Sequence, residues 1–153
     1  MATSTLDERG VIVPCSRCGT RNRVPFGREA KCGSCGTLLT PPGDPIEIPT
    51  AGAFDALVSA SKTPIVVDFW APWCAPCRMV APELARVAKD HAGTWMVVKV
   101  NTDALPELGA RYRIQSIPTM TVFAGGREIA RTTGARPAAD IEAFVRQAVG
   151  NRR

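Results

Sequence analysis

The chain contains, at residues 68–78, the sequence Asp68-Phe69-Trp70-Ala71-Pro72-Trp73-Cys74-Ala75-Pro76-Cys77-Arg78. The run from 65 to 70 is almost entirely apolar, which predicts a strand buried on both faces. Residues 78–92 have apolar side chains at helical spacing, with Pro82 predicting a kink. The two cysteines are therefore predicted to lie where a buried strand gives way to a helix.

This position favours redox chemistry for the pair. A helix N-terminus presents unpaired N–H groups and a positive partial charge, so we expect the Cys74 thiolate to be favoured. Cys74 is then the nucleophile on a substrate disulfide, and Cys77, one turn further on, resolves the mixed disulfide. Pro76 offers no N–H, which keeps the pair reducing. The alternatives are a metal half-site, which needs a second pair nearby, and two inert core thiols.

The other cysteines form a separate group. Two C-x-x-C pairs, each followed by glycine, lie 13 residues apart in the first part of the chain: Cys15, Cys18, Cys32 and Cys35. Four thiolates at this spacing predict a structural Zn²⁺ site with no vacant ligand position. An iron–sulfur cluster and disulfides are the alternatives. Few apolar residues lie between the pairs, so we expect this module to need its metal to fold. No organic cofactor is predicted.

The composition and charge of the chain exclude several classes of protein. The chain has 153 residues, a formal net charge of +5 and 22% charged residues, which excludes two full enzyme domains and wholesale disorder. The apolar runs are too short for a membrane helix, and residues 1–14 lack the apolar region of a secretory signal, so we expect a cytoplasmic protein. Nucleic-acid binding has little support, because no aromatic residues interleave the basic ones, Arg17, Arg21, Arg23, Arg28 and Lys31.

A Pro- and Gly-rich linker over 40–45 separates a zinc-binding module over 1–39 from an α/β domain over 46–153. Apolar periodicity in the second part predicts a mixed sheet with helices on both faces. A short strand over 46–48 comes first. The further elements are a helix over 53–60, strand 65–70, helix 78–92, strand 95–100, helix 104–112, strands 119–124 and 128–133 joined by a glycine turn, and a final helix ending before Gly150.

Together with Ser116-Ile117-Pro118-Thr119, about forty residues on, the 68–78 sequence resembles the thioredoxin family. The resemblance covers residues 46–149 and implies the thioredoxin fold. The four-cysteine extension, a small zinc-ribbon-like module, is similar to that of the zinc-containing thioredoxins of the thioredoxin 2 type. One departure is Ala75, where the family motif has glycine. We expect the added methyl group to leave thiol–disulfide exchange intact but to affect the reduction potential of the cysteine pair.

The resemblance also implies roles for individual residues. Pro118 is the family's cis-proline facing the disulfide, and it lets the Ile117 backbone pair with substrate. Asp68 is the buried carboxylate that accepts a proton when Cys77 attacks. Independently, a carboxyl inside an apolar strand must be desolvated, which raises its pKa. The alternative for Asp68 is a structural acid paired with Lys99.

The family's client surface is flat, apolar and arranged around an exposed Cys74. Its positions here are Trp73, Ala75, Pro76, Ile117, Pro118 and Gly134. Trp70 is predicted to pack under the active-site loop, and His91 to be a helix C-terminal partner.

These observations predict a monomeric protein-disulfide reductase. The resemblance implies that it passes electrons from thioredoxin reductase to oxidised client proteins through a Cys74–Cys77 redox-active disulfide. One alternative is a zinc-dependent binding or chaperone-like redox sensor that uses the fold as a scaffold. Another is an oxidase or isomerase, which the proline between the cysteines argues against.

Overall fold

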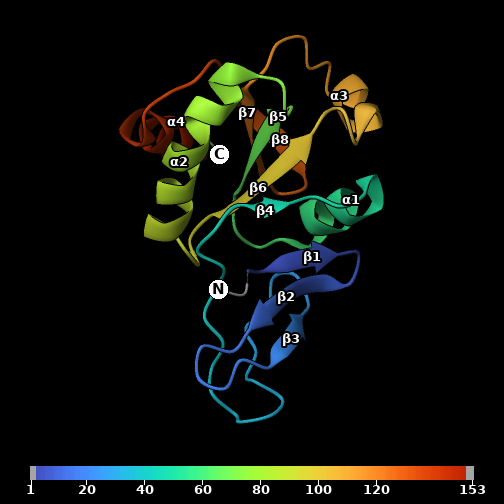
Figure 1. The fold of residues 1–153 in the computed structure, drawn as a ribbon, viewed down its shortest axis with the longest axis vertical. Helices are drawn as coiled ribbons and strands as arrows, with labels where there is room; N and C mark the ends of the chain where they lie inside the picture. The colour runs from blue at the N-terminus through green and yellow to red at the C-terminus, as the bar shows by residue number, and fades with distance from the viewer. Residues whose placement is uncertain (1–2, 151–153) are drawn as a thin grey trace.

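The computed structural model describes residues 3–150, which form two β-sheets and four helices (Figure 1). The larger sheet has five strands in the order β4-β6-β5-β7-β8. Their bounds are Ile46–Glu47 for β4, Ile65–Trp70 for β5, Met96–Asn101 for β6, Thr119–Ala124 for β7 and Arg127–Thr133 for β8. β4, β6 and β5 run parallel to one another, whereas β7 and β8 are antiparallel to their neighbours.

Helices cover both faces of this sheet (Figure 1). α1 (Ala51–Ala60) and α3 (Pro106–Arg111) pack on one face, where Val67 and Phe69 of β5 point. α2 (Ala75–Asp90) and α4 (Ala138–Gly150) pack on the other face, over Val66. Because side chains alternate along a strand, Asp68 and Trp70 share the α2 face with Val66.

The smaller sheet is antiparallel, with the order β1-β2-β3, and lies beside α1 and β4 (Figure 1). Its strands are β1 (Thr5–Asp7), β2 (Gly10–Pro14) and β3 (Arg21–Val24). Four of its apolar side chains, Leu6, Val11, Val13 and Val24, belong to the same buried cluster as Ile46, Phe54 and Leu57. The N-terminal segment therefore shares a core with the larger sheet.

The predicted α/β class and order of elements are confirmed, and helix and strand ends agree to within about three residues. The three N-terminal strands were not predicted, because their apolar residues are few and gain a buried face only against α1 and β4. His91 caps the end of α2, and its Nε2 lies 2.5 Å from Glu142 Oε2 on α4. Within residues 3–150, no helix is long and apolar enough to cross a membrane.

Candidate functional site

Cys74 and Cys77 form a disulfide at the start of α2, with their Cα atoms 5.2 Å apart. Cys74 is the N-cap residue of the helix, and Pro76 lies in its first turn, where a proline's missing N–H costs nothing. The Cys74 Sγ atom accepts a hydrogen bond from the Cys77 backbone N–H at 3.2 Å. The sequence around the cysteines thus builds a helix terminus whose free N–H group points at the first sulfur.

Exposure does not separate the two cysteines. Cys74 is 4% exposed and Cys77 is 3% exposed, and both pack with Ala71 against Trp70 and Ile117. The expectation of an openly exposed Cys74 is therefore wrong for the disulfide form, because the apolar loop residues close over the sulfurs. What distinguishes Cys74 is its place at the helix N-terminus.

The second segment that carries the family resemblance, residues 116–119, lies directly against the disulfide. The Ile117–Pro118 peptide bond is cis, and the Ile117 carbonyl oxygen lies 3.7 Å from Cys74 Sγ. The Pro118 carbonyl accepts a hydrogen bond from the Gly134 N–H at 2.9 Å, which holds the loop after β8 at the same edge. Three separate loops therefore meet around Cys74.

The remaining predicted contact residues surround this meeting point. Trp73 is 68% exposed, and Ala75, Pro76 and Gly134 are also exposed. The Trp73 indole Nε1 donates to Asp103 Oδ1 at 3.3 Å, which orients the ring across the surface. The result is a patch of apolar groups beside a nearly buried disulfide.

Asp68 lies on β5 with no exposed surface, and neither of its carboxylate oxygens has a hydrogen-bond partner within residues 3–150. Burial raises the pKa of this carboxyl to about 7, although the positive charge of Lys99 opposes the increase. Negative charge on Glu47 adds to it. A carboxyl with a pKa near 7 can both accept and return a proton at neutral pH.

Lys99 is beside Asp68 in the register of β5 and β6. Its Nζ atom, however, lies 4.3 Å from the centroid of the Trp70 ring. Trp70 itself is half-buried beneath the disulfide, and its Nε1 donates to Glu47 Oε2 at 3.1 Å. Sequence reasoning missed Glu47, because a charged residue at the edge of a short strand is typical of an ordinary solvated position.

The thioredoxin family model matches residues 45–147, which is more than half of the chain. The chain belongs to the thioredoxin family. Among curated thioredoxins, it is 36% identical over 140 residues to Thioredoxin C-3 of Corynebacterium nephridii, covering 90% of this chain and 94% of that protein. It is 44% identical over 98 residues to the chloroplastic M-type thioredoxin of Zea mays.

The maize match covers 64% of this chain and 59% of that protein, so the chain spans less than two thirds of that relative's length. Among solved structures, chloroplastic thioredoxin z superimposes with a TM-score of 0.64 and 34% identity, over 71% of this chain and 96% of the other. The match to Thioredoxin C-3 is longer than the thioredoxin region of 45–147, so it reaches into the four-cysteine segment.

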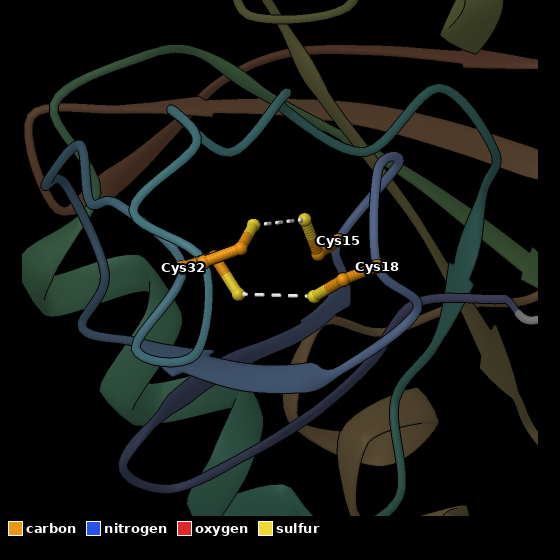
Figure 2. Close-up of side chains that lie close together, drawn as sticks. Cys15, Cys18 and Cys32 are labelled. Carbon is orange, nitrogen blue, oxygen red and sulfur yellow. Dashed lines mark hydrogen bonds between the residues drawn. The ribbon is translucent and has the colours of Figure 1, made fainter.

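The four N-terminal cysteines of this thioredoxin-family chain come together at one point (Figure 2). Their sulfur atoms all lie within 4.8 Å of one another, and the pairs Cys15–Cys35 and Cys18–Cys32 are each separated by 3.6 Å. Four sulfurs placed tetrahedrally at a Zn–S distance of about 2.3 Å would be about 3.8 Å apart. The cluster therefore has the donor set and spacing of a four-cysteine zinc site.

The two loops that carry these cysteines have matching backbone geometry. Gly19 and Gly36 have φ values of +79° and +78°, a region that favours glycine, and each donates to the carbonyl four residues earlier at 2.9 Å. Backbone N–H groups of Cys35 and Ser34 lower the pKa of Cys32 to about 6. The backbone thus favours the thiolate of Cys32, which is the form that ligates a metal.

Proposed function

We propose that this thioredoxin-family chain is a protein-disulfide reductase that alternates between a Cys74/Cys77 dithiol and the Cys74–Cys77 disulfide. One observation carries the proposal: Cys74 is the N-cap of α2, accepts the Cys77 N–H at 3.2 Å and lies 3.7 Å from the Ile117 carbonyl. The helix terminus stabilises negative charge on this sulfur, and the thiolate is the form that attacks disulfides.

The reaction takes two exchange steps. The Cys74 thiolate attacks one sulfur of a client disulfide, forms a mixed disulfide and releases the other client sulfur as a thiolate. Cys77 then loses its proton and attacks the Cys74 sulfur. This closes the Cys74–Cys77 disulfide and releases the second client sulfur, so that the client gains two electrons and this chain loses two.

Asp68 is proposed as the proton acceptor for Cys77, since it is buried, carries a carboxyl with a pKa of about 7 and accepts no hydrogen bond from residues 3–150. Lys99, on the neighbouring strand, lowers the pKa of that carboxyl through its positive charge. The Ile117 backbone beside the cis Pro118 pairs with the client backbone. The exposed groups of Trp73, Ala75, Pro76 and Gly134 provide the apolar contact.

A reductase of the thioredoxin reductase type is the proposed electron source, and disulfide-containing proteins are the proposed clients. Reducing conditions in a cytoplasm suit both the recharge of this pair and the thiolates of the four-cysteine cluster. There, Cys15, Cys18, Cys32 and Cys35 would hold a structural Zn²⁺ that stabilises the fold of the module. We retain the division into a zinc module over 1–39, a linker over 40–45 and a thioredoxin domain over 46–153.

An insulin-disulfide reduction assay tests the proposal. The parent chain with a reductant should precipitate the insulin B chain, and Cys74→Ser should reduce the rate to that of the reductant alone. Cys77→Ser should instead accumulate a covalent mixed disulfide with insulin, visible by non-reducing electrophoresis. Equal rates for the parent and Cys74→Ser would refute the reductase function.

The alternative, a zinc-dependent binding or chaperone-like redox sensor, is favoured by one observation. A largely apolar pocket of about 410 Å³ lies between the N-terminal module and the thioredoxin region, with Val13, Phe26, Leu57 and Trp95 among its walls. Unfolded polypeptide is the ligand that this function requires. Suppression of aggregation that persists in the Cys74→Ser/Cys77→Ser double variant would support it.

A further inference from the structure

Three charged side chains lie in one row across the strands at the edge of the larger sheet. In the parallel register, Glu47 of β4 pairs with Lys99 of β6, and Lys99 pairs with Asp68 of β5. Paired positions on neighbouring strands direct their side chains to the same face. Lys99 is therefore between two carboxyl groups, one at the exposed edge and one fully buried.

Trp70 contacts both Glu47 and Lys99 of this row. Its position is two residues beyond Asp68, on the same face of β5, and it packs against the disulfide cluster. The edge of the indole donates from Nε1 to Glu47 Oε2 at 3.1 Å, while Lys99 Nζ lies 4.3 Å from the centroid of the ring. Glu47 thus fixes the ring on whose face the ammonium group is held.

No other ionised group competes for Asp68 within residues 3–150. Across β7, its register partner is Met120, which carries no charge. On α2, Cys77 is in the disulfide and carries no charge. Three charged side chains of this helix have other partners: Glu83 Oε1 lies 3.6 Å from Arg86 Nη1, and Arg78 donates to the Pro72 carbonyl. The charges that act on the Asp68 carboxyl are those of Lys99 and Glu47.

We propose that Glu47 is a positioning residue for the proton-transfer step: it holds Trp70 and draws the Lys99 charge toward the sheet edge, away from Asp68. This inference rests on the proposed function of Asp68 as the proton acceptor for Cys77. Partial desolvation also raises the pKa of Glu47 itself, opposed by the Trp70 hydrogen bond and by Lys99, so this carboxylate is coupled to the row and not merely solvated.

The test is the titration of the Asp68 side-chain carboxyl in the oxidised protein, followed by ¹³C NMR, with Asp68→Asn identifying the resonance. In this form, Cys74 and Cys77 do not titrate. Glu47→Gln keeps an oxygen that can accept from Trp70 but removes the charge. We expect the Asp68 midpoint to fall by roughly half a pH unit, because a like charge is lost and Lys99 is freed toward Asp68.

Two further variants complete the test. Lys99→Met should move the Asp68 midpoint in the opposite direction, to higher pH. Glu128→Gln is the matched control, since it removes a carboxylate that pairs with Arg131 on β8, the opposite edge strand, and should leave the midpoint unchanged. An Asp68 midpoint that does not fall in Glu47→Gln, or that falls equally in Glu128→Gln, would overturn the inference.

The titration separates this inference from the proposed function, because it needs no turnover. If the parent chain reduces insulin and Glu47→Gln leaves the Asp68 midpoint unmoved, Glu47 has no such role and the reductase function stands. If insulin is not reduced by the parent chain, the proposed function fails, and with it the part of this inference that concerns proton transfer.

Discussion

The Sγ atom of Cys74 lies 3.7 Å from the carbonyl oxygen of Ile117, although 43 residues separate the two in the chain. Sheet register explains the contact. β5 and β7 are antiparallel, with Phe69 opposite Thr119. The loop that follows β5 and the loop that precedes β7 therefore lie at the same end of these two strands. A client polypeptide bound at Cys74, as proposed above, would lie against the Ile117 backbone and beside Trp73.

Replacing Trp73 with alanine should weaken client binding without changing the exchange chemistry. The side chain is 68% exposed and is held by the bond from its Nε1 to Asp103, so it offers apolar contact area to a partner. We expect kcat/KM for insulin to fall several-fold, mostly through KM, while the rate with a small aromatic disulfide changes by less than about twofold.

The matched control for that variant is Leu38→Ala, which removes a 57% exposed side chain from the N-terminal module, away from the disulfide. Its kcat/KM for insulin should equal that of the parent. If Trp73→Ala slows the small disulfide as strongly as insulin, then Trp73 shapes the reactivity of Cys74 itself, and its role as a client contact is wrong.

Asp68→Asn should stabilise the fold, and the gain should depend on pH. The pKa of this carboxyl is about 7 in the folded chain, against a usual value of 3.8, so between these values the folded state binds the extra proton. The destabilising effect of Asp68 is consequently small near pH 4, grows as pH rises toward 7 and is complete above it. At pH 8, the variant should gain up to roughly 4 kcal/mol in free energy of unfolding.

Urea unfolding of oxidised protein at pH 4.5 and pH 8 measures this difference. Asparagine preserves the size of the side chain, so a change in packing would shift stability equally at both pH values. A gain of the same size at pH 4.5 and pH 8 would therefore contradict an ionised, desolvated Asp68 as the cause.

Removing the proposed Zn²⁺ should unfold the N-terminal module and lower the stability of the thioredoxin region as well. The Cys15 loop joins β2 to β3, and the Gly33 N–H in the Cys32 loop donates to Asn22 Oδ1 on β3 at 2.9 Å. This sheet shares its buried cluster with Ile46 and Phe54. We expect one bound zinc ion per chain by elemental analysis, none in Cys15→Ser/Cys32→Ser, and a Tm lower by several degrees in that variant.

The control for metal removal is the Cys74→Ser/Cys77→Ser double variant, which should keep a full complement of zinc because these cysteines lie in a separate cluster. Unchanged Tm and unchanged amide protection of β1–β3 after chelation would show that the shared apolar core, rather than the metal, holds the module on β4 and α1.

How far the sequence predicts this molecule depends on whether a feature is local. The 65–70 run and the 68–78 motif predict the strand, the helix and the reactive cysteine from adjacent residues alone, and the structure has β5 and α2 there. The four-cysteine cluster is likewise predicted from spacing, because two short knuckles each fix two ligands.

Features that depend on register between distant segments were not predicted. Glu47 acts beside Lys99 only because β4 lies next to β6 rather than β5, an order that no stretch of sequence encodes by itself. Strands β1–β3 were not predicted for the same reason: Leu6, the three-residue run at 11–13 and Val24 are short apolar stretches in a polar segment, and they are buried only against α1 and β4.

Glu83 shows the same dependence on tertiary structure and permits a clean test. Its Oε1 atom accepts a hydrogen bond from the Ala138 N–H at 2.9 Å, so a side chain from α2 caps the first turn of α4. Glu83→Ala should lower the free energy of unfolding by about 1 kcal/mol, whereas Glu83→Gln keeps an acceptor and should lose less. Arg86→Ala removes only the ion pair between Arg86 Nη1 and Glu83 Oε1, at 3.6 Å, and should lower the free energy of unfolding by less than about 0.5 kcal/mol. Urea unfolding midpoints at constant m-value measure all three variants. If Arg86→Ala lowers the free energy of unfolding as much as Glu83→Ala does, the ion pair and not the cap is the cause.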